Sequence, residues 1–143
     1  MTRISIVLFS FILSACATTK QYFPMGTPDN LTPGNALIKV ERRYEGVLGI
    51  GRSVEITDDG KVVGQVSAGE HLIWQRPAGD FQLQLVSAFG IVSNPIPLKV
   101  TAEPGKQYDF VVFYCRSDGP EGWACGHRNW PRRGSMALRP RER

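Results

Sequence analysis

The stretch "FVVFYCRSDGPEGWACGHRNWP", residues 110–131, concentrates the side chains of this chain that could do chemistry. It contains Cys115, Cys125 and His127, with Trp123 and Trp130 beside them. Cysteines with a histidine can ligate zinc, a cysteine next to a histidine can act as a nucleophile, and two cysteines can form a disulfide. Which of these chemistries is possible depends on whether the protein is exported to an oxidising compartment. The N-terminal residues of the chain address that question.

The first 15 residues predict a signal peptide. Arg3 supplies a short positive region, and the apolar run Ile4–Leu13 is too short for a membrane-spanning helix, which needs about 20 residues. The run ends in "LSAC", residues 13–16, which resembles the bacterial lipoprotein signal. The resemblance implies cleavage before Cys16 and a diacylglycerol on its sulfur. An ordinary secretory signal that happens to contain a cysteine is the alternative.

A lipid on Cys16 would turn its sulfur into a thioether and leave Cys115 and Cys125 as the two remaining thiols. Exported compartments are oxidising, so this pair predicts a disulfide. The turn-rich "RSDGPEGWA" between the cysteines allows the chain to reverse and bring them together. A zinc site with His127 lacks the close cysteine spacing of zinc knuckles, and a nucleophilic cysteine would need a free thiol.

The rest of the chain offers little for catalysis. The only other histidine, His71, is expected on the solvent face of a strand. The glycine-rich residues 45–54 lack the Lys-Ser/Thr pair of a phosphate loop, and Asp58 and Asp59 fall in a turn where exposed carboxylates are expected. The sequence therefore predicts a protein that is not an enzyme, with no catalytic residues, no metal and no cofactor.

Residues 16–35, rich in Thr, Pro, Gly and Asn, predict a lipidated N-terminus followed by a flexible tether. From Ala36 onward, alternating apolar residues separated by turn signals predict about seven strands, the pattern of an all-β sandwich or barrel. The turn signals are "DDGK", "PAGD" and "EPGK", and Gly64 is expected at a bulge or a close crossing. The expected strands lie near residues 36–41, 53–57, 62–66, 72–74, 81–85, 96–100 and 108–115.

The runs "VEITDDGKVVGQVSAGEHLIWQRPAGDFQLQL" and "PIPLKVTAEPGKQYDFVVF" carry a further resemblance. They resemble a family of uncharacterised small bacterial lipoproteins whose domain is related to the PEGA-type β-sandwich. The resemblance covers roughly residues 36–114 and consists mainly of turn motifs. It implies a single immunoglobulin-like or PEGA-like antiparallel sandwich, expected over residues 36–125, and a place in the cell envelope. It implies no activity, because the family has none established.

Residues 126–143 form a basic tail that accounts for the positive net charge of +4 and is expected to be disordered. Trp123 and Trp130, with the arginines of the tail, could form a surface for anionic lipid or cell wall. The arginines in question are Arg128, Arg132 and Arg133. Nucleic acid is not expected as a partner of an exported protein.

The whole pattern predicts a non-enzymatic lipoprotein of the bacterial envelope that serves as a binding or accessory module. It would be held in the membrane by its acyl anchor and would contact another envelope protein or the cell wall. By resemblance to the sorting rule of enteric-type bacteria, Ala17 after the cysteine, instead of Asp, implies the outer membrane with the body facing the periplasm. The alternative is a lipoprotein that binds peptidoglycan or carbohydrate through exposed aromatic side chains and the basic tail.

Overall fold

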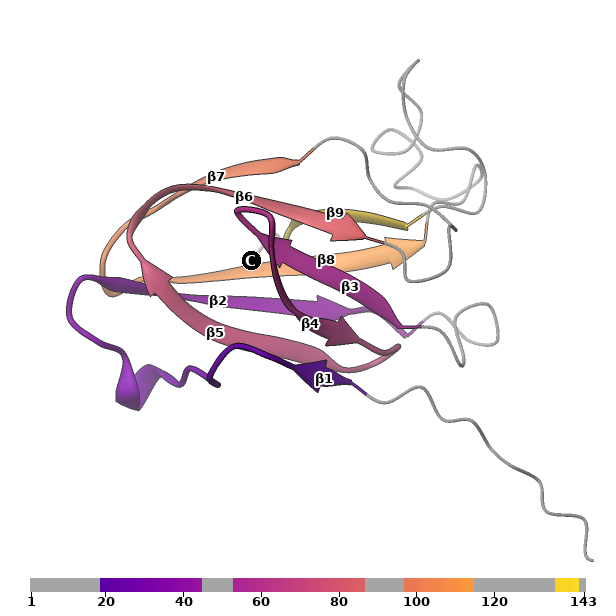
Figure 1. Ribbon diagram of the computed structural model, residues 1–143, viewed down its shortest axis with the longest axis horizontal. Helices are drawn as coiled ribbons and strands as arrows, with labels where there is room; N and C mark the ends of the chain where they lie inside the picture. Colours follow the sequence, from indigo (N-terminus) through magenta and orange to yellow (C-terminus); the bar gives the residue numbers. More distant parts are fainter. Residues whose placement is uncertain (1–18, 45–52, 87–96, 115–135, 142–143) are drawn as a thin grey trace, which may run out of the picture.

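The computed structural model of the chain describes residues 19–44, 53–86, 97–114 and 136–141. Apart from one short 3-10 turn, η1 (Pro28–Asn30), the regular elements of this part are strands in two sheets (Figure 1). The five-stranded sheet has the order β1 (Lys20–Gln21), β4 (Lys61–Val66), β3 (Val54–Asp58), β6 (Gly79–Val86) and β7 (Leu98–Ala102). The four-stranded sheet has the order β5 (His71–Pro77), β2 (Asn35–Arg42), β8 (Gln107–Tyr114) and β9 (Met136–Pro140).

The predicted all-β sandwich is confirmed, and the expected strands correspond to β2 through β8. One strand pair departs from the antiparallel prediction. Strands β2 and β8 run parallel, with Leu37 opposite Gln107 and Arg42 opposite Val112. Between them the chain forms β3 and β4 in the five-stranded sheet, β5 in the four-stranded sheet, and then β6 and β7 in the five-stranded sheet. The two parallel strands are therefore joined by a crossover rather than a hairpin.

The core lies between the two sheets and is built by the alternation seen in the sequence. Phe81, Leu83 and Leu85 are buried, as predicted, and the glutamines between them point away from the core. Trp74 is fully buried, and His71 at the start of the same strand is exposed. The core cluster also includes Ala36, Ile38, Val40, Val54, Ile56, Val63, Val66, Leu72, Ala102, Phe110, Val112 and Leu138.

The "DDGK" turn forms the predicted hairpin between β3 and β4. Asp59 and Gly60 have φ of 48° and 78°. Positive φ at both central positions is the geometry of a type I′ turn, whose twist suits a two-residue hairpin. The Asp59 carboxylate accepts a hydrogen bond from the Gln82 N–H at 2.9 Å, and the Asp59 N–H donates to the Gln82 carbonyl. The turn is therefore fastened to β6.

The prediction of a flexible tether up to residue 35 is wrong for residues 19–35. Residues 19–27, which we call the N-terminal strap, run from one sheet to the other. Strand β1 pairs with β4, and Met25 forms an isolated bridge with Trp74 on β5. The Gln21 side chain also pairs with the backbone of β5, as a neighbouring strand would. Its Nε2 donates to the Ile73 carbonyl at 2.9 Å, and its Oε1 accepts from the Ile73 N–H at 3.1 Å.

The strap forms because, without it, the outer N–H and C=O groups of β4 and β5 would lack partners. It supplies these partners mainly through its backbone and one amide side chain. Such pairing leaves no apolar alternation, and the composition of the segment therefore did not reveal it.

The prediction of a disordered tail is wrong for Met136–Pro140, which form β9 beside β8. Leu138 is buried in the core, and Met136 packs against it. Past the strand, the Arg141 N–H donates to the Asp109 carbonyl at 2.8 Å. Strand β8 is therefore central, as its two apolar faces predicted, but it is not the last strand.

We expect Gly64→Ala to displace the strap. A Cβ at Gly64 would collide with the Lys20 carbonyl oxygen, so the predicted close crossing at this glycine is confirmed. The variant should lower the free energy of unfolding by about 1–3 kcal/mol, the usual cost of overpacking. Trypsin should also cleave faster after Lys20, which can be followed by mass spectrometry under native conditions. Lys61→Ala on the same strand is the control, and an unchanged cleavage rate after Lys20 in Gly64→Ala would contradict the role of the crossing.

Candidate functional site

The residues that the sequence singled out for lipid attachment, disulfide formation and surface binding all lie outside the described residues. They are Cys16, Cys115, Cys125, Trp123, Trp130, Arg128, Arg132 and Arg133. The structure therefore leaves these predictions as they were. His127, considered for zinc or for nucleophile activation, lies outside as well.

Within the described ranges, no group of three or more His, Cys, Asp or Glu side chains could hold a metal ion. No helix in that part of the chain is long and apolar enough to cross a bilayer. Trp74, one of three tryptophans in the chain, is fully buried and cannot stack on a sugar.

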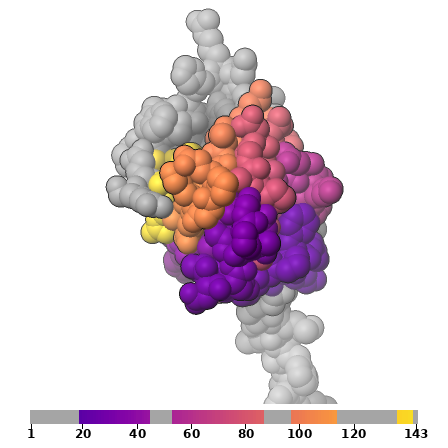
Figure 2. All heavy atoms as spheres, turned by 90° about the vertical axis from the view of Figure 1, so that its left-hand side faces the viewer, coloured from indigo at the N-terminus to yellow at the C-terminus, as the bar shows by residue number. Residues whose placement is uncertain are grey.

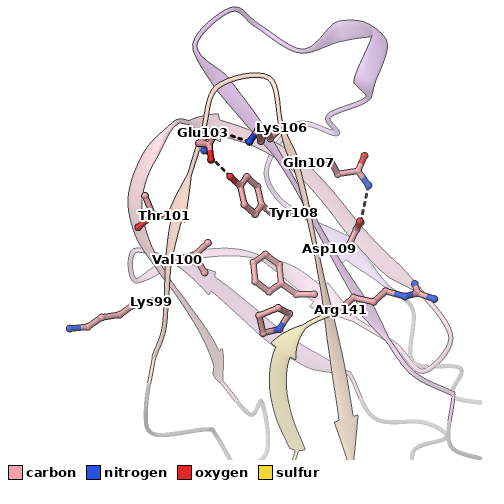
Figure 3. A pocket seen from close by; sticks show the side chains of 11 residues that line it. Lys99, Val100, Thr101, Glu103, Lys106, Gln107, Tyr108, Asp109 and Arg141 are labelled. Atoms are coloured by element: carbon pink, nitrogen blue, oxygen red, sulfur yellow. Dashed lines mark hydrogen bonds and ion pairs between the residues drawn. The ribbon is translucent and has the colours of Figure 1, made fainter. Parts of the chain in front are cut away.

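A groove that the sequence did not reveal lies between β7 and β8, where the two sheets separate (Figure 3). We call it the edge groove. Its volume is about 780 Å³, within the range of ligand-binding clefts. Figure 2, which faces this end of the molecule, shows the orange β7–β8 region beside the yellow β9. The groove is lined by Lys99, Val100, Thr101, Glu103, Lys106, Gln107, Tyr108, Asp109, Phe110, Pro140 and Arg141.

The floor of the edge groove is apolar and its rim is polar. Val100, Tyr108 and Phe110 form most of the floor, and Figure 3 shows Val100 and Tyr108 in the space between the two strands. The Tyr108 hydroxyl accepts a hydrogen bond from the Glu103 N–H at 2.9 Å, which holds the "EPGK" turn over one end of the groove. An apolar floor with a polar rim is the arrangement that binding sites use for affinity and specificity.

The rim carries both signs of charge. Lys106 pairs with Glu103 at 2.6 Å, and the Glu103 carboxylate raises the pKa of the lysine through this hydrogen bond and charge pair. On the other wall the Gln107 amide donates to Asp109 at 2.8 Å. Arg141, beyond the end of β9, pairs with Glu41 at 2.7 Å. Lys99 on β7 adds a further exposed cation.

Strand β7 is an edge of the five-stranded sheet, as Pro95 and Pro97 in its approach predicted. Among the strands that the structure describes, it pairs only with β6. Three residues of the strand, Lys99, Val100 and Thr101, line the edge groove. A strand edge next to an apolar groove can hydrogen-bond an extended peptide while the groove takes alternate side chains.

A buried polar cluster at the same end of the sandwich as the edge groove joins the two sheets. We call it the inter-sheet clasp. Asp58 on β3 is only 5 % exposed, so the expectation of an exposed turn carboxylate is wrong for this residue. Its Oδ2 accepts the Trp74 indole N–H at 2.9 Å, and its Oδ1 pairs with Arg76 on β5. Arg76 also reaches Asp59 at 3.2 Å.

The clasp is connected to the edge groove through one ring. The guanidinium of Arg76 lies 4.0 Å from the centroid of the Phe81 ring, a cation–π contact between the sheets. Phe81 pairs across β6 and β7 with Val100, which lines the groove. The clasp therefore helps to set the position of β7 relative to the four-stranded sheet.

Burial raises the pKa of the Asp58 carboxyl above its ordinary value, because a charged carboxylate loses its hydration inside the sandwich. The Trp74 hydrogen bond and the Arg76 charge lower the pKa and oppose this effect without cancelling it. No sequence signal marks Asp58, since "DDGK" reads as a solvent-exposed turn and only the packing of β5 covers its first residue.

Searches of protein-family models, of curated proteins and of solved structures find no match to this chain.

The raised pKa of Asp58 predicts a pH-dependent contribution to stability. The folded state binds this proton more tightly than the unfolded chain, so the contribution is complete below the unfolded value near 3.8 and is lost as pH rises through the raised pKa. The stability advantage of the wild type over Asp58→Asn should therefore grow as pH falls from neutral toward 4, measured by urea unfolding at several pH values.

Asp59→Asn is the matched control, because it removes an equal charge at a carboxylate that is 52 % exposed. A wild-type advantage over Asp58→Asn that shrinks on acidification would mean that Trp74 and Arg76 outweigh burial, and it would contradict a raised pKa at Asp58.

Proposed function

We propose that the protein is a lipid-anchored accessory module of the bacterial envelope that binds an extended segment of another envelope protein in the edge groove. The observation that carries this proposal is the edge groove itself, with its apolar floor beside the outer edge of β7. Main-chain pairing along β7 would supply affinity, and Val100, Tyr108 and Phe110 would receive alternate side chains of the bound segment.

The anchor belongs to this proposal through the sequence. The signal peptide, "LSAC" and Ala17 support acylation of Cys16 and a place in the outer membrane, with the body in the periplasm. The same address supports a disulfide between Cys115 and Cys125, since the periplasm is oxidising. Partner binding without catalysis is the role that this combination favours.

Recognition of peptidoglycan or carbohydrate is the alternative that the sequence raised. It would depend on Trp123, Trp130 and the arginines near them, which lie outside the described residues. No contact within the described part favours it over the groove, and crosslinking in intact cells separates the two.

Replacing Cys16 with serine should release the protein from membranes. The variant cannot receive the thioether-linked lipid, and the body would enter the soluble fraction of the envelope. Membrane fractionation of expressing cells, with immunoblotting of pellet and supernatant, measures the change. A Cys16→Ser protein that still sediments with membranes would contradict the anchor.

A photo-crosslinking amino acid in place of Lys99 should capture a protein partner in intact cells. Lys99 lies on the rim of the edge groove and is exposed, so the probe would point at the bound segment without disturbing the core. The adducts are detected by immunoblotting and identified by mass spectrometry.

The same probe at Lys61 is the control, because this exposed lysine lies on β4 and does not line the groove. Adducts of equal yield at both positions, or none at Lys99, would contradict binding in the groove. Adducts that contain peptidoglycan fragments would favour the carbohydrate alternative.

A further inference from the structure

The proposed anchor is very close to the folded body. The chain is held from Thr19 onward, since the Thr19 hydroxyl accepts the Ser67 N–H at 3.0 Å and Lys20 pairs with Gln65. Cys16 precedes Thr19 by three residues. An extended chain spans at most about 3.6 Å per residue, so the two Cα atoms are within roughly 11 Å of each other.

Among the described residues, those nearest to Thr19 belong to the ends of neighbouring strands. Figure 1 shows β2 and β4 ending, and β5 beginning, at the end of the sandwich where β1 starts. The Gly69 N–H donates to the Arg42 carbonyl, and the Arg42 N–H donates to the Glu70 carbonyl. Tyr44 lies against Gly69, at an ordinary van der Waals distance from the position of a Cβ there. We call the exposed residues of this end, Lys20, Arg43, Tyr44, Glu70 and His71, the anchor-end surface.

The chemistry of the anchor-end surface fits the headgroup region of a bilayer. Tyr44 is 61 % exposed, and tyrosine, with an apolar ring and a polar hydroxyl, is enriched where membranes meet water. Lys20 carries positive charge that anionic headgroups attract. Glu70 is exposed at this end, and Glu41, opposite His71, is paired with Arg141.

The edge groove extends from the other end of the sandwich toward its middle. Along the parallel pair of β2 and β8, Leu37 is opposite Gln107, which lines the groove, and Arg42 is opposite Val112. The rise of a strand places these two positions roughly 17 Å apart. Lys106, in the turn before β8, lies on the groove side of this separation.

We propose that the anchor-end surface rests on the phospholipid headgroups and that the edge groove is thereby presented away from the membrane. The inference rests on the proposed acylation of Cys16, because the short connection to Thr19 holds that end of the body near the bilayer. A fixed orientation would keep the groove open to a partner that approaches from the periplasm.

The test places a fluorescent amino acid at His71 or, in a second protein, at Lys106. Each acylated protein is purified from membranes and reconstituted in vesicles of phosphatidylethanolamine and phosphatidylglycerol that contain a lipid with a nitroxide-labelled headgroup. Quenching should be several-fold greater at position 71 than at position 106. Equal quenching at the two positions in vesicle-bound protein would overturn the proposed orientation and leave the anchor intact.

Charge variants test the headgroup contact itself. With the probe at position 71, Lys20→Glu should reduce the quenching, whereas Lys61→Glu, the same change at the hairpin end, should leave it unchanged. Equal effects of the two variants would overturn the contact. The Cys16→Ser protein should not sediment with the vesicles, and failure of the wild-type protein to do so would overturn the anchor and the orientation with it.

Discussion

A hydrogen bond between two buried side chains, Trp74 and Asp58, joins the sheets of this sandwich. A carboxylate removed from water needs donors, and here both donors, the Trp74 indole and the Arg76 guanidinium, come from the opposite sheet. Sliding one sheet over the other would leave the carboxylate without them. The apolar core alone allows some sliding, because hydrophobic burial has no direction. The clasp therefore fixes the relative position of the sheets, and the cation–π contact of Arg76 with Phe81 extends this to the wall of the edge groove.

The two lateral edges of the sandwich differ in structure. On one side the N-terminal strap pairs with β4 and β5 and joins the sheets through the Gln21 amide and the Met25 bridge. On the other side β7 and β8 separate around an apolar floor, and the edge groove is the result. The strap also brings the start of the folded body to within a few residues of Cys16. The described part of the chain therefore has one edge closed by the strap, one edge open at the groove, and one end next to the proposed anchor.

Much of the fold could be predicted from the sequence, because β2 to β8 alternate apolar and polar residues between turns that need glycine. Phe81, Leu83 and Leu85 are the clearest example, and the "DDGK" hairpin another. Two strands, β1 and β9, were not predicted. Strand β1 binds through backbone groups without an apolar pattern, and β9 has only Met136, Ala137 and Leu138 among basic residues. The candidate site could not be predicted, since the edge groove is a space between β7 and β8 and not a motif within either strand.

The sequence by itself determined the strand-rich fold class, the principal turns and the apolar residues that make the core, because these depend on local backbone preference and on period-two alternation. The proposed envelope address also rests on sequence alone, through a short N-terminal signal. Tertiary structure decided which residues meet across the sandwich. It placed Asp58 under Trp74, joined residues 19–27 to both sheets, and opened the groove beside β7. Each of these depends on how two sheets pack and which edges are left unpaired, and such contacts join residues far apart in the chain that carry no shared local pattern.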